Sequence, residues 1–224
     1  MITLGIDTSA VFVSAALCKD GRVLAQRFES GARTHSETLL PMVEEVLQES
    51  GLVVGSVNRF AVTCGPGSFT GVRIGVAAVK GMAFVGQRPC AGVSALAAMA
   101  VRAQNEEAVP PVLCCAMDAR RGQVYAAVFE NGRRTMEDTA LPVAALAQRL
   151  PADKPVWFLG DGAQLCRDTL EKRPNWQLAP ENVRYQTGLG AVLAARAEDY
   201  RPPALLRAVY LRPSQAERLR LGIE

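Results

Sequence analysis

Two aspartates stand at the ends of apolar stretches, where a side chain can reach a ligand. Asp7 ends "LGID" and is followed by Thr8 and Ser9, and Asp118 ends "LCCAMD". A carboxylate can hold a hydrated magnesium ion, and neighbouring hydroxyls can donate to a phosphate. The same residues can instead form a turn that side-chain to backbone hydrogen bonds fix, and this alternative stays open. All four residues are candidates for a nucleotide or phosphate site.

The sequence holds 1 histidine, His35, in "THSETLLP". A zinc site uses two or three imidazoles, and Leu39 occupies the place of the second ligand in an H-x-x-x-H pair. A Ser-His-Asp triad would need the same histidine, and no G-x-S-x-G elbow is present. Metal catalysis and nucleophilic hydrolysis are therefore disfavoured, no metal or other cofactor is expected, and we expect a structural role for His35 at the start of a helix.

The stretch "GPGSFTGVRIG", residues 65–75, is rich in glycine but lacks the lysine of a P-loop and the spacing of G-x-G-x-x-G. Gly71 and Gly75 fall four apart on one face of a predicted helix, and Ala78 and Met82 continue the row. An interior glycine costs a helix about 1 kcal/mol relative to alanine. The row therefore predicts that another backbone comes close, either in the chain's own sheet or in a partner's helix.

The composition is typical of a protein of a reducing compartment, with free cysteines and no membrane-spanning segment. The formal net charge is +3, and the 6 cysteines form no C-x-x-C pair. No signal-like or spanning stretch is found, which predicts a cytoplasmic protein. Arginines gather near the end of the sequence and would give either a local basic surface or a solvated tail: Arg196, Arg201, Arg207, Arg212, Arg218 and Arg220.

The predicted strands and helices that must position these residues follow a similar pattern in the two halves of the sequence. Alternating strands with Asp-Gly at 20–21 open the chain, and helices follow over about 36–50 and 68–85. After Asn105–Pro111, two further strands around Gly122 begin the second half, with helices predicted near 143–150, 163–172 and 189–200. The pattern predicts two lobes, 1–106 and 107–224, each an apolar sheet with helices.

Several stretches together resemble the TsaB (YeaZ) family, the partner subunit of the bacterial machinery that makes threonylcarbamoyladenosine in transfer RNA. They are "GIDTS", "HSETLLP", "GPGSFTGVRIG", "MDARRGQVYAA" and "YLRP", and they span nearly the whole chain. The resemblance implies an α/β fold of the actin-like and Hsp70-like ATPase class (ASKHA), with two lobes of mixed sheet flanked by helices. In the related catalytic subunit TsaD an H-x-x-x-H pair binds metal, and here Leu39 replaces its second histidine. The resemblance therefore implies a non-catalytic subunit, with Asp7, Thr8, Ser9 and Asp118 as a vestigial site.

The family also implies partners. The helices near 36–50 and 68–85 would pair with those of TsaD, would form a homodimer through the same face when TsaD is absent, and would act with TsaE in the full complex. Contact with transfer RNA is expected to be indirect at most. The expected partner-binding residues are His35, Leu39, Met42, Val43, Val46, Gly71, Val72, Gly75, Val79 and Met82.

Two other classes of function are weighed against the scaffold. An ATPase or small-molecule kinase of the same fold would use Asp7, Thr8, Ser9 and Asp118 around a nucleotide, but "DARRG" lacks the glycine and hydroxyl content of a second phosphate loop. A metallopeptidase is disfavoured because it needs more than one histidine.

Overall fold

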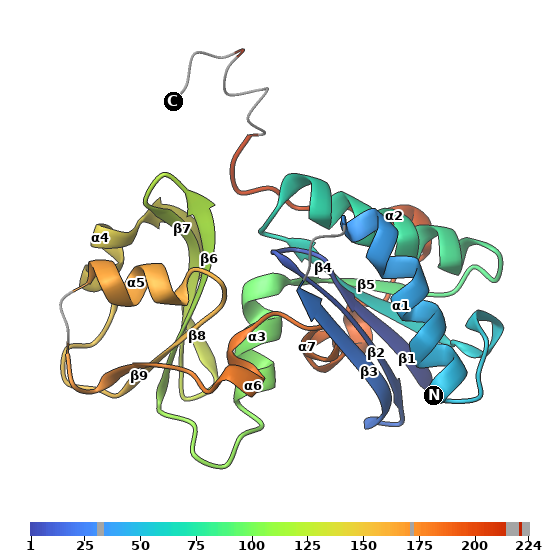
Figure 1. The fold of residues 1–224 in the computed structure, drawn as a ribbon, viewed down its shortest axis with the longest axis horizontal. Coiled ribbons are helices and arrows are strands. Elements are labelled where there is room, and N and C mark those ends of the chain that lie inside the picture. The colour runs from blue at the N-terminus through green and yellow to red at the C-terminus, as the bar shows by residue number, and fades with distance from the viewer. Residues whose placement is uncertain (31–33, 171–172, 214–219, 221–224) are drawn as a thin grey trace.

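The computed structural model describes residues 1–30, 34–170, 173–213 and 220, and places two five-stranded mixed sheets beside each other (Figure 1). The first sheet has the order β3-β2-β1-β4-β5 and the second β10-β9-β6-β7-β8. The strands of the first are β1 (Ile2–Asp7), β2 (Phe12–Lys19), β3 (Arg22–Ser30), β4 (Arg59–Gly65) and β5 (Cys90–Ser94). Those of the second are β6 (Val112–Arg120), β7 (Gln123–Glu130), β8 (Arg133–Pro142), β9 (Val156–Leu159) and β10 (Trp176–Leu178).

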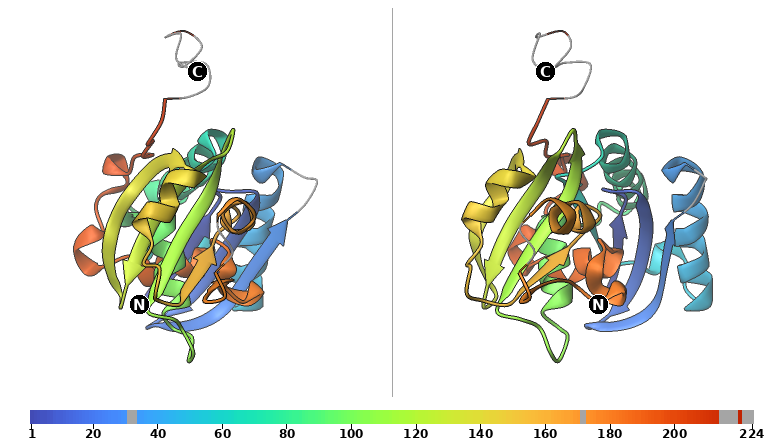
Figure 2. Two further views of the ribbon diagram at one scale, coloured as in Figure 1. Left: turned by 90° about the vertical axis from the view of Figure 1, so that its left-hand side faces the viewer. Right: turned by 60° about the vertical axis from the view of Figure 1, so that its left-hand side comes forward.

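Helices α1 (His35–Glu49) and α2 (Phe69–Phe84) cover one face of the first sheet. Leu4 and Ile6 of β1 point to this face because successive side chains of a strand alternate, and both are fully buried. In Figure 2 (right), α1 lies on the side of the first sheet away from the second sheet. Both helices were predicted from sequence with nearly these ends.

The opposite face of the first sheet is covered by α7 (Gly188–Ala194), which comes from late in the chain. The contact is very close, because a Cβ added to Gly5 would lie 2.1 Å from the carbonyl oxygen of Gly188. Gly188 N also donates to the Ser14 hydroxyl at 3.1 Å. The end of the chain therefore completes the core of the first sheet.

Helix α3 (Ala95–Ala103) follows β5 but packs into the core of the second sheet. Leu96 and Met99 are buried with Leu113 and Met117 of β6. Helices α4 (Val143–Leu146) and α5 (Ala163–Thr169) pack against the other face of the second sheet. Helix α6 (Glu181–Arg184) lies close to α3. The boundary predicted between residues 106 and 107 stays a prediction. α3 precedes this boundary but packs on the second sheet, and α7 follows it but packs on the first sheet.

Some strand and helix ends follow local sequence signals, and others depend on tertiary contacts. The hairpin predicted at Asp20 and Gly21 is confirmed, with φ of +49° and +82° in the turn between β2 and β3. The helix predicted over 189–200 instead ends at Ala194. Beyond it the chain forms a 3-10 turn, Ala197–Asp199, and then a single antiparallel bridge to β5 at the edge of the first sheet, in which Arg201 N donates to Cys90 O at 3.0 Å.

Two further helices are shorter than predicted. The one expected over 143–150 is α4 followed by a 3-10 turn, Ala147–Arg149, and α5 ends at Thr169, with 171–172 outside the described residues. Within the described ranges, no helix combines the length and the apolar character needed to cross a membrane.

Candidate functional site

A cleft of about 320 Å³ lies where the two sheets face one another. It is lined by Ser9, Ala10, Val11, His35, Gly67, Ser68, Met117, Asp118, Ala119, Arg120, Tyr125 and Asp161. Ser9 and Asp118, which sequence analysis selected from the two halves, thus meet in one place. We call this the interlobe cleft. The first lobe is the first sheet with the residues packed on it, and the second lobe is the second sheet with the residues packed on it.

The tip after β1 is held by its own hydrogen bonds. Ser9 donates to Asp7 Oδ1 from both its backbone N and its hydroxyl, each at 3.0 Å, and Thr8 Oγ1 donates to the carbonyl of Gly71 at 2.7 Å. Asp7 and Thr8 are buried, and of these residues only Ser9 reaches the cleft lining. The hydroxyls that sequence analysis offered to a phosphate are therefore engaged inside the chain.

Burial raises the pKa of Asp7 above its ordinary value of 3.8. The neighbouring Thr63 hydroxyl, the hydrogen bonds from Ser9 and the proximity of His35 act in the opposite direction, because they favour the carboxylate. The tip therefore holds an acid whose charged form the fold disfavours.

Asp161 is a cleft residue that sequence analysis did not select. It follows β9, the strand "VWFL", and Gln186 donates to its Oδ1 from Nε2 at 3.3 Å. Burial raises its pKa, and the nearby Asp118 adds to that rise. The signal was present in the sequence, since "VWFLGDG" ends an apolar strand with an aspartate as "LGID" and "LCCAMD" do.

The glycine row of α2 faces the tip after β1. A Cβ on Gly71 would lie 2.1 Å from the backbone oxygen of Thr8, and one on Gly75 would lie 2.4 Å from Thr8 Oγ1. The close backbone that the row predicts is therefore the chain's own. The interpretation that these two glycines make room for a partner's helix is wrong, because Thr8 already fills that space.

Most of the other residues expected to bind a partner are also turned inward. Six of them are buried in the core between the helices and the first sheet: Leu39, Met42, Val43, Val46, Val72 and Val79. Met82 is partly buried at the edge of that core. Their helical spacing reports packing on the chain's own sheet.

His35, the first residue of α1, lines the cleft. Its Nε2 lies 2.7 Å from the carbonyl oxygen of Ala10. The residue before it, Thr34, caps the helix, and its backbone N donates to the Glu37 carboxylate at 2.9 Å. His35 therefore helps to hold α1 against the loop after β1.

Sequence analysis missed the apolar side chains that α1 and α2 expose. A groove of about 390 Å³ runs between α1, the 3-10 turn Val54–Ser56 and α2, and is lined by Leu40, Val43, Glu44, Leu47, Gln48, Leu52, Val53, Val54 and Met82. Leu40 is 55% exposed and Val53 66%, and at the end of α2 Phe84 is 69% and Val85 92% exposed. Their signal was an apolar residue off the core stripe of its helix.

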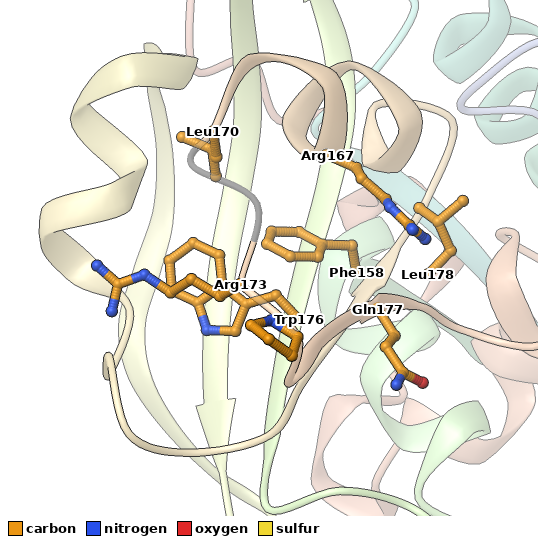
Figure 3. Close-up of a pocket in the computed structure, with 8 residues that line it drawn as sticks. Phe158, Arg167, Leu170, Arg173, Trp176, Gln177 and Leu178 are labelled. Atoms are coloured by element: carbon orange, nitrogen blue, oxygen red, sulfur yellow. The ribbon is translucent and has the colours of Figure 1, made fainter.

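Another hollow, of about 480 Å³, lies on the second lobe beside α5 and β10 (Figure 3). Phe158 and Trp176 form part of its wall, with Arg167 and Arg173 toward opposite sides. None of the residues selected from the sequence lines it. Across the described part of the chain, no group of three or more His, Cys, Asp or Glu side chains is placed to hold a metal ion.

Comparisons with known proteins agree on one family. The family model of TsaD, tRNA N6-adenosine threonylcarbamoyltransferase, matches residues 22–198. The tRNA threonylcarbamoyladenosine biosynthesis protein TsaB of Escherichia coli K12 is 37% identical over 211 residues, 91% of this chain and 86% of that protein. TsaB of Bacillus subtilis is 32% identical over 177 residues, 76% of each chain.

Solved structures give the same family and the wider fold. A Pseudomonas aeruginosa protein described as similar to peptidase YeaZ has a TM-score of 0.79 at 32% identity, over 94% of this chain and 99% of that one. Component A of (R)-2-hydroxyglutaryl-CoA dehydratase from Acidaminococcus fermentans has a TM-score of 0.53 at 15% identity, over 87% and 97%, and shares the fold alone. The predicted actin-like ATPase fold class is thereby confirmed.

Proposed function

This chain belongs to the TsaB (YeaZ) family of tRNA threonylcarbamoyladenosine biosynthesis proteins, and from this premise we propose that it is the non-catalytic scaffold subunit that binds and activates TsaD. TsaD would transfer the threonylcarbamoyl group to adenosine in tRNA, and TsaE would join the full complex. The chain would work in the cytoplasm and would touch tRNA indirectly at most.

The observation that carries this proposal is the exposed apolar surface on α1 and α2. Leu40 and Val53 leave large apolar side chains in water at the groove between α1 and α2, and Phe84 and Val85 do so at the end of α2; none of the four lines the interlobe cleft. Contiguous exposed apolar groups on a protein surface mark an interaction site, because covering them removes that area from water. We assign the partner contact to these residues in place of the buried ones that the sequence suggested.

The interlobe cleft gives less support to the alternative of an ATPase or kinase. Asp118 and Asp161 line it, and among its described lining residues the arginine, Arg120, already contacts the Asp118 carboxylate at 3.4 Å. Phosphates need cations or free backbone donors, and the hydroxyls of Thr8 and Ser9 are engaged within the tip. Nucleotide turnover by the purified chain above background would favour the alternative.

The test is co-purification with TsaD of the same organism after Phe84→Asp or Leu40→Asp. Each change puts a charge on an exposed position, so the fold should be retained while burial under a partner becomes costly. We expect loss of the complex, together with loss of any homodimer in analytical ultracentrifugation.

Leu193→Asp is the matched control. Leu193 is an exposed apolar residue of α7, which covers the opposite face of the first sheet, so this variant should still bind TsaD. Full complex formation by Phe84→Asp and Leu40→Asp would refute the assigned surface.

A further inference from the structure

The last described stretch of the chain, Leu206–Pro213, runs beside the loop that begins α2. Val209 N donates to the carbonyl of Cys64 at 2.7 Å. A Cβ added to Gly65 would lie 2.1 Å from Val209 O, so Gly65 leaves the room in which this segment lies. In Figure 1 the red segment passes the start of α2 and rises between the two lobes. We call residues 206–213 the strap.

The strap is anchored on the first lobe by an aromatic contact. The rings of Tyr210 and Phe69 have centroids 4.8 Å apart, and Arg73 Nε donates to the Tyr210 hydroxyl at 2.9 Å. The Arg73 guanidinium also lies 3.9 Å from the centre of the Phe69 ring. A tilted aromatic contact, a cation–π contact and a hydrogen bond therefore hold Tyr210 at the first turn of α2.

Two residues further on, the strap reaches the second lobe. The Arg212 guanidinium donates to the carbonyl of Ala119 at 3.3 Å. Ala119 lies in β6 between Asp118 and Arg120, and all three line the interlobe cleft, as do Gly67 and Ser68 on the other rim. The strap therefore joins the two rims of the cleft.

We propose that the strap holds the two lobes at a fixed separation. Its role resembles that of a bound ligand in a protein whose two lobes close around the ligand by a hinge motion. In such proteins, contacts between the ligand and both lobes offset the cost of closure. Here the bridging groups belong to the chain itself, so they are present at the high effective concentration of an intramolecular segment. This inference does not rest on the proposed function.

The test measures the distance between spin labels placed at Ala77→Cys in α2 and Gln164→Cys in α5, two exposed positions on helices of different lobes. The native cysteines are buried, and burial raises the pKa of Cys64 and of Cys90 to about 11, so the introduced thiols should react first. Dilution of the labelled chain in unlabelled chain removes distances between copies.

Arg212→Ala removes the contact with the second lobe, and Tyr210→Ala removes the anchor on the first. We expect both changes to shift the distance distribution to longer values and to broaden it. Arg207→Ala is the control, because the Arg207 guanidinium donates to the carbonyls of Ala204 and Leu206, at 3.0 Å to Leu206 O, and both are close to it in sequence. Distributions for Arg212→Ala and Tyr210→Ala that equal that of the unchanged strap would overturn the proposal.

Discussion

Asp7 shows how the fold changes the chemistry of a single residue. It sits at the end of a strand, where an aspartate would reach a ligand, yet its side chain is buried and accepts its hydrogen bonds from Ser9. Burial disfavours the carboxylate, and the raised pKa reports that the folded chain holds the proton more tightly than the unfolded chain does. The position that resembles a ligand-binding tip is therefore a buried turn.

A pH dependence of stability follows from that shift. Because the folded state binds the proton more tightly, the stability contributed by Asp7 is full below its ordinary value of 3.8 and is lost as the pH rises toward the folded pKa. Asp7→Asn mimics the protonated form at every pH. We expect the free energy of unfolding of Asp7→Asn, minus that of the unchanged chain, to rise with pH across this window in urea titrations.

Asp153→Asn is the control for this measurement, since it removes an exposed carboxylate of the second lobe. Its difference from the unchanged chain should vary less with pH than that of Asp7→Asn. A difference for Asp7→Asn that stays constant or falls with rising pH would contradict the assignment of a raised pKa.

At the scale of one element, α2 has two surfaces with different roles. Its first turns place Gly71 and Gly75 against Thr8, while its last turn exposes Phe84. Ser68 caps the helix by accepting from Gly71 N at 3.2 Å. The start of the helix therefore fixes the tip after β1, and the end is left for contacts outside the chain.

Two glycines of α2 should respond to alanine in opposite ways. Gly71→Ala would bring a Cβ to 2.1 Å from Thr8 O. Because this backbone atom cannot turn away, we expect the free energy of unfolding to fall by about 1–3 kcal/mol. Gly81→Ala meets no atom within 4 Å and should gain up to about 1 kcal/mol from helix propensity. Urea unfolding measures both, and equal effects of the two changes would contradict the close contact with Thr8.

At the scale of the whole molecule, the two halves of the sequence exchange helices. α7 lies on the first sheet although it follows the second in sequence, and α3 lies in the core of the second sheet although it follows the first. The bridge between Cys90 and Arg201 adds a further contact between the late chain and β5. Neither half of the sequence contains all of the side chains that bury its own sheet.

A fragment that stops at residue 106 tests this exchange. It would lack α7 and would expose the face of β1 that carries Gly5, so we expect it to bind a hydrophobic dye and to unfold without a cooperative transition. The full chain should unfold cooperatively in the same circular dichroism measurement. A cooperative transition in the fragment would show that the predicted division at 106–107 separates independent units.

The sequence by itself determined the local structure and the family. Alternation of side chains predicted the opening strands, Asp20 and Gly21 predicted their turn, and helical spacing predicted α1 and α2, because each depends on residues close in the chain. The ordered motifs predicted the TsaB family, which the comparisons confirm.

Only the tertiary structure decided which residues meet. Ser9, Asp118 and Asp161 lie at or just beyond the carboxyl ends of three strands far apart in the sequence, and only the packing of two sheets brings them to one cleft. The same holds for Gly71, since a row of glycines predicts a close neighbour without saying whose backbone it is. Spacing along a chain fixes the face on which a residue lies, but the partner of that face depends on long-range contacts that no local pattern encodes.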